Sequence, residues 1–381
     1  MHASSPDATE HRPARSIADP PPVEAERLHG GVPVLLPDPA HPWESRVVLN
    51  PAGQLVEAGA ELDRLMDAWE LPDAERGRLR KAGGACVLLY RAQGEVDPEK
   101  EMAPSSVGLA VFTPALDLVR RWDRPTLSPD APYHDLGLED PRCTRVGDRY
   151  FLYYTGYASG ATDDDDRTVR VCLATTQDFL DWELHGPVPN DWGELPNKNA
   201  ALLPGPIDAL GGQHVLLHRP MAGPDAMTVH WATADDPAGP WATRGRLMES
   251  FAYAEFASSW IGAGGPPEAL GDGRYVAVYH QGHFTEHGDR EYDLAAALFD
   301  FREAQPLRAR IEPLMRPTGA AETEGDASLG VDNVLFSCAN YRWRGNLVIP
   351  YAGADSRIFG ASLVFADLLA ALEQRAGPDV R

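Results

Sequence analysis

GDRYFLYYTG, residues 147–156, predicts a tight turn followed by a β-strand, because a Gly-Asp pair precedes an apolar, aromatic run. The same pattern occurs five times along the chain: a Gly-bearing turn, an apolar run, and then a tyrosine or histidine. The copies are GGACVLLYRA (83–92), GDRYFLYYTG (147–156), GGQHVLLHRP (211–220), GDGRYVAVYHQ (271–281) and RGNLVIPYAG (344–353). The residue after the tyrosine or histidine recurs at intervals of 64, 64, 61 and 72, so the chain is built on a repeat.

Strand candidates flank every copy of the repeat. Those before it are RVVLN, EDPRCTRV, NAALLP, PPEAL and VDNVLFS, and those after it are SVGLAVFT, TVRVCLAT, AMTVHWAT, DLAAALFD and ASLVFA. Each unit therefore contains three or four short strands that can pair in antiparallel fashion. Five such units predict an all-β fold, a five-bladed β-propeller around a central channel. A helical solenoid fits neither the period nor the strand-like composition.

Two segments depart from the repeat and predict helices. Residues 61–82 form a helical insertion in the first blade, and ADLLAALEQRAG (366–377) forms a C-terminal helix. The apolar residues at helical spacing in the insertion are Leu62, Leu65, Met66 and Trp69. This stripe fits a lid or an oligomer contact over the channel, and it also fits a part of the core.

The two ends of the chain and the cysteines complete the domain prediction. Residues 1–30 are rich in proline and charge and lack an apolar signal core, so we expect a disordered leader ahead of one propeller domain at 31–381. The four cysteines are far apart and show no C-x-x-C spacing. Buried free thiols in a reducing compartment follow, and we expect a cytoplasmic protein.

The charge of the chain limits its partners. Among 381 residues, 57 are acidic and 34 are basic, which gives a net charge of −23. Such a charge repels phosphate backbones and anionic membrane surfaces, so neither nucleic acid nor membrane is an expected partner. A binding site for an anion would need a local cluster of basic side chains.

The repeat itself supplies such a cluster. Equivalent positions in all blades of a propeller converge at one end of the channel, and Arg91, Arg219 and His280 occupy this position in three copies. Because like charges repel, an anion or carboxylate between them is the expected partner. The alternative is that each cation pairs separately with a carboxylate of a neighbouring blade.

One motif carries a family resemblance. HDLGLEDPRCTRVGDRYFLYYTGY, residues 134–157, resembles the EDPR region of glycoside hydrolase family 130, the β-mannoside phosphorylases and related mannosidases. Further pieces match in the same order: Asn50-Pro51 with LLYRA, NKNAALLP with LLHRP, IGAGGPP with VAVYHQG, and YAGADS. The resemblance extends over about residues 50–366 and implies a five-bladed propeller.

The resemblance also implies site residues and a co-substrate. The catalytic acid maps to Asp140, and a glycosidic oxygen needs such a proton donor to leave. Inorganic phosphate acts as the nucleophile in the phosphorylases, and its ligands map to Lys198, Arg219 and His280. A further family lysine is replaced by Trp260 in this chain. The expected substrate-binding residues are Asn50, Arg91, Arg142, Trp260 and Asp355.

The resulting hypothesis is inverting phosphorolysis of a β-mannoside oligosaccharide that releases mannose 1-phosphate. A hydrolase of the same family stays open, with Glu268 as the nearest candidate for the base, as does a sugar-binding propeller without activity. A homo-oligomer is also left open. We expect no metal or organic cofactor, because His280, His283 and His287 follow a strand between glycines and not the face of a helix.

Overall fold

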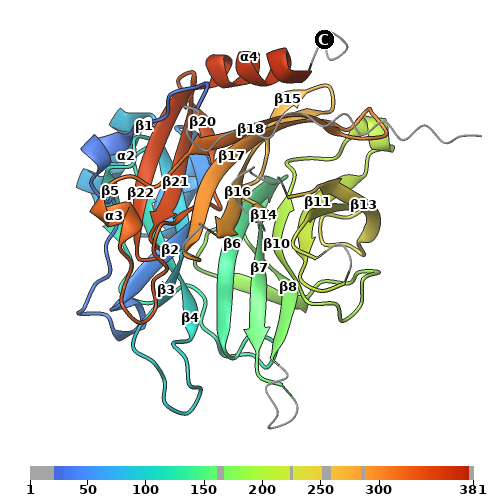
Figure 1. Ribbon diagram of the computed structural model, residues 1–381. Coiled ribbons are helices and arrows are strands. Elements are labelled where there is room, and N and C mark those ends of the chain that lie inside the picture. The colour runs from blue at the N-terminus through green and yellow to red at the C-terminus, as the bar shows by residue number, and fades with distance from the viewer. Residues whose placement is uncertain (1–20, 161–166, 224–225, 251–258, 285–287, 377–381) are drawn as a thin grey trace, which may run out of the picture.

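The computed structural model describes residues 21–160, 167–223, 226–250, 259–284 and 288–376. Strands dominate this part of the chain, as Figure 1 shows, so the predicted all-β class is confirmed. Most of the predicted leader, residues 1–20, lies outside the described residues. Residues 21–31 contain β1 (Glu26–Arg27), which pairs with the last strand of the chain, and the 3₁₀ turn Leu28–Gly31.

The first half of the chain forms one eight-stranded sheet. This sheet consists of two antiparallel groups that meet at a single parallel pairing, between Ser105 and Gly137. The first group contains β2 (Val47–Glu57), β3 (Gly84–Gln93), β4 (Ser105–Phe112) and β5 (Leu118–Arg121). The second group contains β6 (Gly137–Val146), β7 (Arg149–Ala158), β8 (Thr168–Thr176) and β9 (Trp182–Pro187).

The second half of the chain forms three separate sheets. The third group contains β10 (Asn197–Leu202), β11 (His214–Pro220), β12 (Val229–Ala234) and β13 (Ala242–Met248). The fourth contains β14 (Ser259–Ala263), β15 (Glu268–Gly271), β16 (Arg274–Phe284), β17 (Arg290–Asp300) and β18 (Leu307–Met315). The fifth contains β19 (Leu335–Phe336), β20 (Tyr341–Trp343), β21 (Asn346–Gly353), β22 (Arg357–Val364) and β1.

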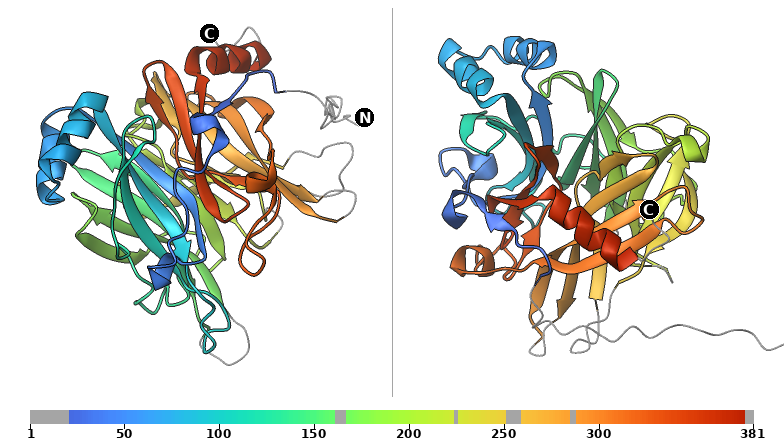
Figure 2. Two further views of the ribbon diagram at one scale, coloured as in Figure 1. Left: turned by 90° about the vertical axis from the view of Figure 1, so that its left-hand side faces the viewer. Right: turned by 90° about the horizontal axis from the view of Figure 1, so that it is seen from above.

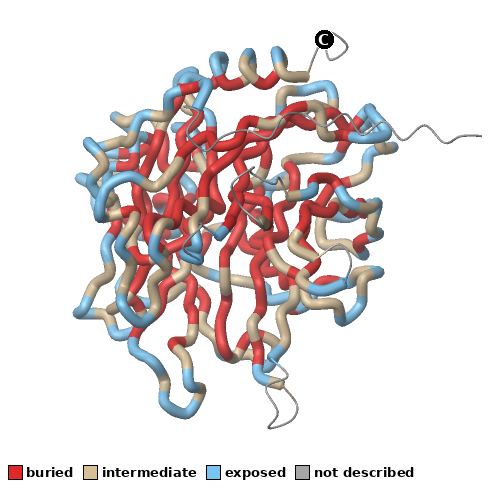
Figure 3. The backbone as a smooth tube through the Cα atoms, viewed as in Figure 1, coloured by how far each residue is buried: buried red, intermediate tan, exposed pale blue. Residues whose placement is uncertain are grey.

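The sequence repeat corresponds to the same strand in every group. Its five copies form β3, β7, β11, β16 and β21, each next to the first strand of its group. Apolar side chains from both faces of these strands belong to the clusters between neighbouring groups. Figure 3 shows that most of the strand residues inside the molecule are buried. The chain colours follow one another around the molecule when it is seen from above (Figure 2, right).

The hydrophobic clusters connect the groups in order. Separate clusters join the first group to the second, the second to the third, the third to the fourth, and the fourth to the fifth. A further cluster joins the fifth group back to the first, where Leu88 and Tyr90 pack with Val348 and Ile358. Each group therefore buries apolar surface against two neighbours.

Four α-helices in the described part of the chain lie outside the strand groups. They are α1 (Ala60–Ala68), α2 (Asp73–Ala82), the one-turn α3 (Ala320–Thr323) and α4 (Phe365–Ala376). Helix α4 lies across strand ends at the top of Figure 1 and packs Leu368 and Leu372 into the core.

The insertion α1–α2 belongs to the core. Its predicted apolar residues are at most 3% exposed and pack against strands of the first two groups. The indole N–H of Trp69 donates to the carbonyl of Asp178, and the Tyr150 hydroxyl donates to Glu61. The insertion follows the last residue of β2, whereas Asn50 lies near the start of that strand. The helices are therefore at the strand ends opposite Asn50, and they do not cover the end at which Asn50 lies.

Replacing a core residue of this insertion should destabilise the protein. Leu65 is fully buried, so Leu65→Ala should lower the free energy of unfolding by about 2–5 kcal/mol. Denaturant unfolding of the full chain measures this change. Lys81→Ala, an exposed change in the same insertion, should stay within about 0.5 kcal/mol of the parent. Equal small effects of both changes would contradict the placement of the stripe in the core.

Candidate active site

The first strands of three groups share a local distortion. Their registers shift between Leu49 and Ala52, between Glu139 and Arg142, and between Lys198 and Ala201. Within the shifts, three residues have left-handed backbones, with φ of 48°, 49° and 56°: Asn50, Asp140 and Asn199. Asn and Asp tolerate this conformation better than other side-chain-bearing residues. Each shift is a bulge, and a bulge turns a side chain away from the regular alternation of the strand.

Asp140 lies in a network of polar and charged side chains. The amide of Asn50 donates to its Oδ1 at 2.7 Å, and a guanidinium nitrogen of Arg91 lies 3.4 Å from the same oxygen. Arg91 also forms an ion pair with Glu139 at 2.6 Å. Burial acts to raise the pKa of Asp140, but nearby cations and this hydrogen bond outweigh it and hold the pKa below its usual value. The cations are those of Arg91, Lys198 and Arg142.

Two cations beside this network have no carboxylate partner among the described residues. Arg219 is 5% exposed, and its one hydrogen bond is a long contact of 3.4 Å to the carbonyl of Ile261. Burial lowers its pKa to about 10. Lys198 is its cross-strand neighbour, and burial together with the charge of Arg219 lowers the pKa of Lys198. The alternative in which each cation pairs separately with a carboxylate therefore describes Arg91 but not Arg219.

His280 adjoins the same cations from β16. Burial and the charges of Arg219, Arg142 and Lys198 hold its pKa well below the usual value, so the ring is neutral near pH 7. Its ring lies against Phe336, with centroids 4.0 Å apart. A Cβ at Gly262 would lie 2.3 Å from Nε2 of His280 and 2.8 Å from Oδ1 of Asn199. Glycine is therefore required at position 262 for these two side chains to approach each other.

Asp355 is the second carboxyl group of the site. It follows β21 with a left-handed φ of 44°, and its Oδ1 has no hydrogen-bond partner within the described ranges. Burial raises its pKa to about 7, although the charge of Arg91 opposes the change. Asp140 and Asp355 thus sit in one charge network with pKa values moved in opposite directions. Such a split is typical of sites where one carboxyl group is protonated and the other is ionised.

Arg142 and Trp260 are both largely buried. Three nitrogens of Arg142 donate to the carbonyls of Gly264, Asp140 and Ala263, so this guanidinium links β6 to the end of β14. Trp260 pairs across the strands with Gly282, and a Cβ there would lie 2.2 Å from the indole ring. The ring packs edge-on against Phe284 and Tyr292.

The structure brings together all the predicted site residues, and it adds others. Asn199 is 1% exposed, and neither polar atom of its side chain has a hydrogen-bond partner among the residues that the structure describes. Tyr292 interacts electrostatically with Arg219 and Asp355. A signal for Asn199 was present in the sequence, because it occupies the position in NKNAA that Asn50 and Asp140 occupy in their strands.

Glu268, the base expected for the hydrolase alternative, is not part of this cluster. It lines a cavity with Leu55 and Arg145, which lie toward the ends of β2 and β6, well beyond Asn50 and Asp140. His287 lies outside the described residues, and within them no group of three or more potential metal ligands occurs. No helix in the described ranges is long and apolar enough to cross a membrane.

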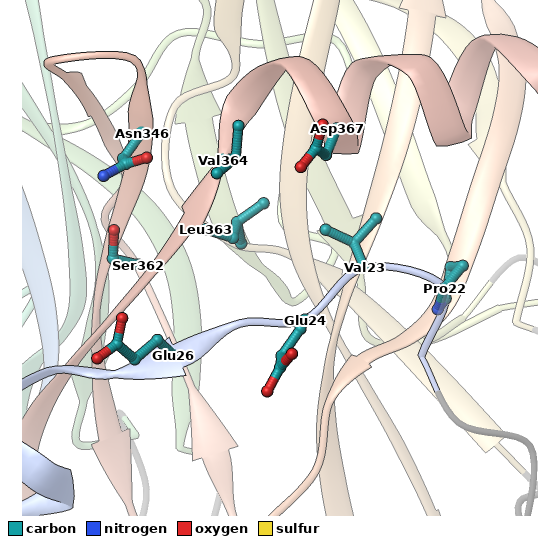
Figure 4. Close-up of a pocket in the computed structure, with 9 residues that line it drawn as sticks. All are labelled: Pro22, Val23, Glu24, Glu26, Asn346, Ser362, Leu363, Val364 and Asp367. Carbon is teal, nitrogen blue, oxygen red and sulfur yellow. The ribbon is translucent and has the colours of Figure 1, made fainter.

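A larger groove lies elsewhere. It has a volume of about 630 Å³ and runs between the segment Pro22–Glu26 and the end of β22 (Figure 4). Its carboxylates are Glu24, Glu26 and Asp367, and it contains none of the predicted site residues. The charge network around Asp140 is therefore the candidate active site.

Comparison with known proteins identifies the family of the chain. A family model described as beta-1,4-mannooligosaccharide phosphorylase matches residues 68–374, most of the chain. The chain belongs to glycoside hydrolase family 130. It is 29% identical to a 1,2-beta-oligomannan phosphorylase of Thermoanaerobacter sp. (strain X514), over 88% of this chain and 96% of that protein. It is also 29% identical to a beta-1,2-mannobiose phosphorylase of the same organism, over 86% and 93%.

Solved structures of family 130 proteins share the fold. A beta-1,2-mannobiose phosphorylase from Listeria innocua superposes with a TM-score of 0.69 at 20% identity, over 92% of this chain and 100% of that one. A family 130 structure from a study of glycoside hydrolases that target beta-1,2 mannosidic linkages in Candida mannan gives 0.68 at 22% identity, over 92% and 96%.

The raised pKa of Asp355 predicts a pH-dependent stability difference in this family 130 protein. The native carboxyl keeps a proton up to about pH 7, whereas the unfolded chain releases it near pH 4, so ionisation favours unfolding as the pH rises between these values. Asp355→Asn cannot ionise. Its free energy of unfolding should rise relative to the parent between about pH 5 and about pH 8, by about 2–3 kcal/mol. Denaturant unfolding at both pH values tests this, and a constant difference would contradict it.

Proposed function

We propose that this protein is an inverting phosphorylase that transfers mannose from a β-mannoside to inorganic phosphate. The observation that carries the proposal is the buried guanidinium of Arg219, which has no carboxylate partner among the described residues and lies beside Lys198. Unpaired buried charges are costly, and a bound dianion compensates both. The two relatives that match over most of their length are both named as phosphorylases, which supports phosphorylase activity for this chain.

We also propose that the five strand groups are the blades of one propeller over residues 31–381. The supporting observation is the set of five hydrophobic clusters, which join each group to two neighbours and the last group to the first. In such a ring the first strands of the blades surround the channel. The bulged residues Asn50, Asp140 and Asn199 then face one another at one end of it.

The proposed reaction uses Asp140 as the general acid. A phosphate oxygen forms a bond to the anomeric carbon from one face while the bond to the leaving oxygen breaks on the other, and Asp140 gives its proton to that oxygen. The cations that lower the pKa of Asp140 include Lys198, and Arg219 also interacts with it. Phosphate bound to these two residues offsets their charge. Its binding should therefore raise the pKa of Asp140 and prepare it to hold a proton.

The remaining residues divide between sugar binding and positioning. Asn50, Arg91 and Asp355 lie around Asp140 and are suited to hydrogen-bond the mannose hydroxyls. Arg142 donates three hydrogen bonds to backbone carbonyls. We therefore assign it the role of holding β6 against β14. His280 contributes a neutral ring nitrogen to the phosphate site. Trp260 and its aromatic neighbours supply an apolar wall where the family pattern has a lysine.

We further propose a β-1,2 linkage for the substrate. The family description names beta-1,4-mannooligosaccharides, but the two relatives that match over most of their length are named for 1,2-linked substrates. Free buried cysteines and a phosphate requirement suit the cytoplasm, which we propose as the location. Comparing cleavage of β-1,2- and β-1,4-mannobiose with phosphate present tests the linkage directly.

Removing the proposed acid should suppress turnover of unactivated substrates. Asp140→Asn keeps the size of the side chain but has no proton to give, so kcat on a mannobiose should fall by about 10²–10⁴. A β-mannoside with a good aryl leaving group needs less protonation and should lose less. Asp123→Asn, at a carboxylate that is 85% exposed, is the control and should behave like the parent. If Asp140→Asn cleaved mannobiose at the parental rate, Asp140 could not be the general acid.

Removing the unpaired guanidinium should weaken phosphate binding. Arg219→Ala loses a charge-assisted hydrogen bond of roughly 1.5–3 kcal/mol, so the KM for phosphate should rise by about ten- to a hundredfold. Lys81→Ala removes an exposed cation and should leave this KM unchanged. Initial rates at varied phosphate and saturating mannoside give both values. An unaltered phosphate KM in Arg219→Ala would show that phosphate does not bind there.

A further inference from the structure

A second cavity lies at the other end of the first strands. Its volume is about 240 Å³, and residues from all five strand groups or their connections line it. Its polar or charged lining residues include Gln54, Arg145, Glu268, Asn340 and Arg342, and Pro204 adds an apolar surface from the third group. The volume lies below the range of drug-sized pockets, so the cavity suits a small ligand.

This cavity is separate from the Asp140 cluster. Thr144 lines it and follows Asp140 by four residues on β6, a distance of about 13 Å along a strand. Arg142 lies between them in the strand and donates across to the carbonyls of Ala263 and Gly264. A ligand in this cavity would therefore not occupy the proposed mannose and phosphate positions.

A hydrogen bond holds the carboxyl group of Glu268 in place on one side. The amide of Asn340 donates to its Oε1 at 2.9 Å and to the carbonyl of Pro266 at 3.0 Å. Oε2 of Glu268 has no hydrogen bond or ion pair to a described residue, although two arginines line the same cavity. Burial raises the pKa of Glu268 to about 7. Oε1 of Glu268 is thus held by Asn340, whereas Oε2 can form a hydrogen bond with a ligand.

Arg145 and Arg342 each have guanidinium N–H groups that can still donate hydrogen bonds to a ligand. Arg145 donates its Nε to the carbonyl of Gly147 and lies 3.8 Å from Glu61. Arg342 stacks over the ring of Phe365, with its guanidinium carbon 4.5 Å from the ring centre. Glu268 would repel an anion in the cavity, and the two arginines would repel a cation. A neutral ligand with several hydroxyl groups avoids both conflicts, because hydroxyls donate to a carboxylate and accept from guanidinium groups.

We infer that this cavity is a second binding site for a neutral, polyhydroxylated ligand of monosaccharide size, held by Glu268, Arg145 and Arg342. Prolines and Tyr341 supply apolar surface for the carbon face of a sugar ring. Free mannose, a product of the reaction proposed above, has this chemistry, and so do other hexoses and sugar alcohols. The site depends on the geometry of the cavity and not on the activity at Asp140.

Calorimetric titration of the full-length protein with mannose tests the inference. The parent should bind two equivalents, one at each end of the channel. Glu268→Ala and Arg342→Ala should each weaken one of the two sites by at least about tenfold, and Arg91→Ala should weaken only the other. Glu268→Gln, which keeps the side-chain volume, gives the same readout if the alanine variant does not fold. Glu303→Gln removes an exposed carboxylate outside the cavity and should match the parent.

The alternative outcomes are distinct. A single mannose site that Arg91→Ala removes and Glu268→Ala leaves intact would overturn the inference, as would the absence of any binding sensitive to Glu268. Parallel titrations with glucose and mannitol show whether the cavity accepts hydroxylated ligands in general or mannose in particular. If mannobiose and phosphate give no turnover while Glu268-sensitive binding persists, the proposed phosphorylase activity fails and the second site stands.

Discussion

The charge imbalance at one end of the strands is the constraint on which the site depends. Lys198 lies within electrostatic range of both Arg219 and Arg91, and among the described residues only Arg91 of these three forms ion pairs with carboxylates. In a protein of net charge −23, this arrangement cannot be a by-product of a generally basic surface. The packing of five strand groups holds these cations together, and a bound phosphate would relieve their repulsion. Arg91 and Lys198 also lower the pKa of Asp140 against the effect of its burial.

Backbone distortion places the reactive side chains. Asn50, Asp140, Asn199 and Asp355 all have left-handed backbones, which cost energy for residues with side chains. The cost is tolerated because the flanking strands continue their pairing on both sides of each bulge. Four residues with the same backbone conformation, from four different strand groups, thus supply amide and carboxyl groups to one site. Replacement by a β-branched residue would be incompatible with this backbone.

The sequence predicted the strands well because each copy of the repeat carries its own turn and apolar run. It predicted the convergence of Arg91, Arg219 and His280 for the same reason, since equivalent repeat positions lie at equivalent places. It could not assign ionisation states. His280 was expected as a cation, but burial and neighbouring charges make it neutral, and those neighbours come from distant segments.

Other features depended on contacts between distant segments. The apolar stripe of residues 61–82 was compatible with a lid, and only its packing against Tyr150 and Phe179 assigns it to the core. Glu268 follows the IGAGG segment closely in sequence, yet it lies at the other end of the strands from Asp140. Closeness in sequence did not predict closeness in space here, because the first strand of a group runs from one end of its sheet to the other.

The identity of the first product tests the central claim most directly. Incubation of β-1,2-mannobiose with the enzyme and phosphate, followed by phosphorus and proton NMR from the earliest time points, detects the product and its anomeric configuration. The account predicts α-mannose 1-phosphate and mannose in equal amounts, with no cleavage when phosphate is omitted. Release of free mannose alone, at the same rate with and without phosphate, would contradict it.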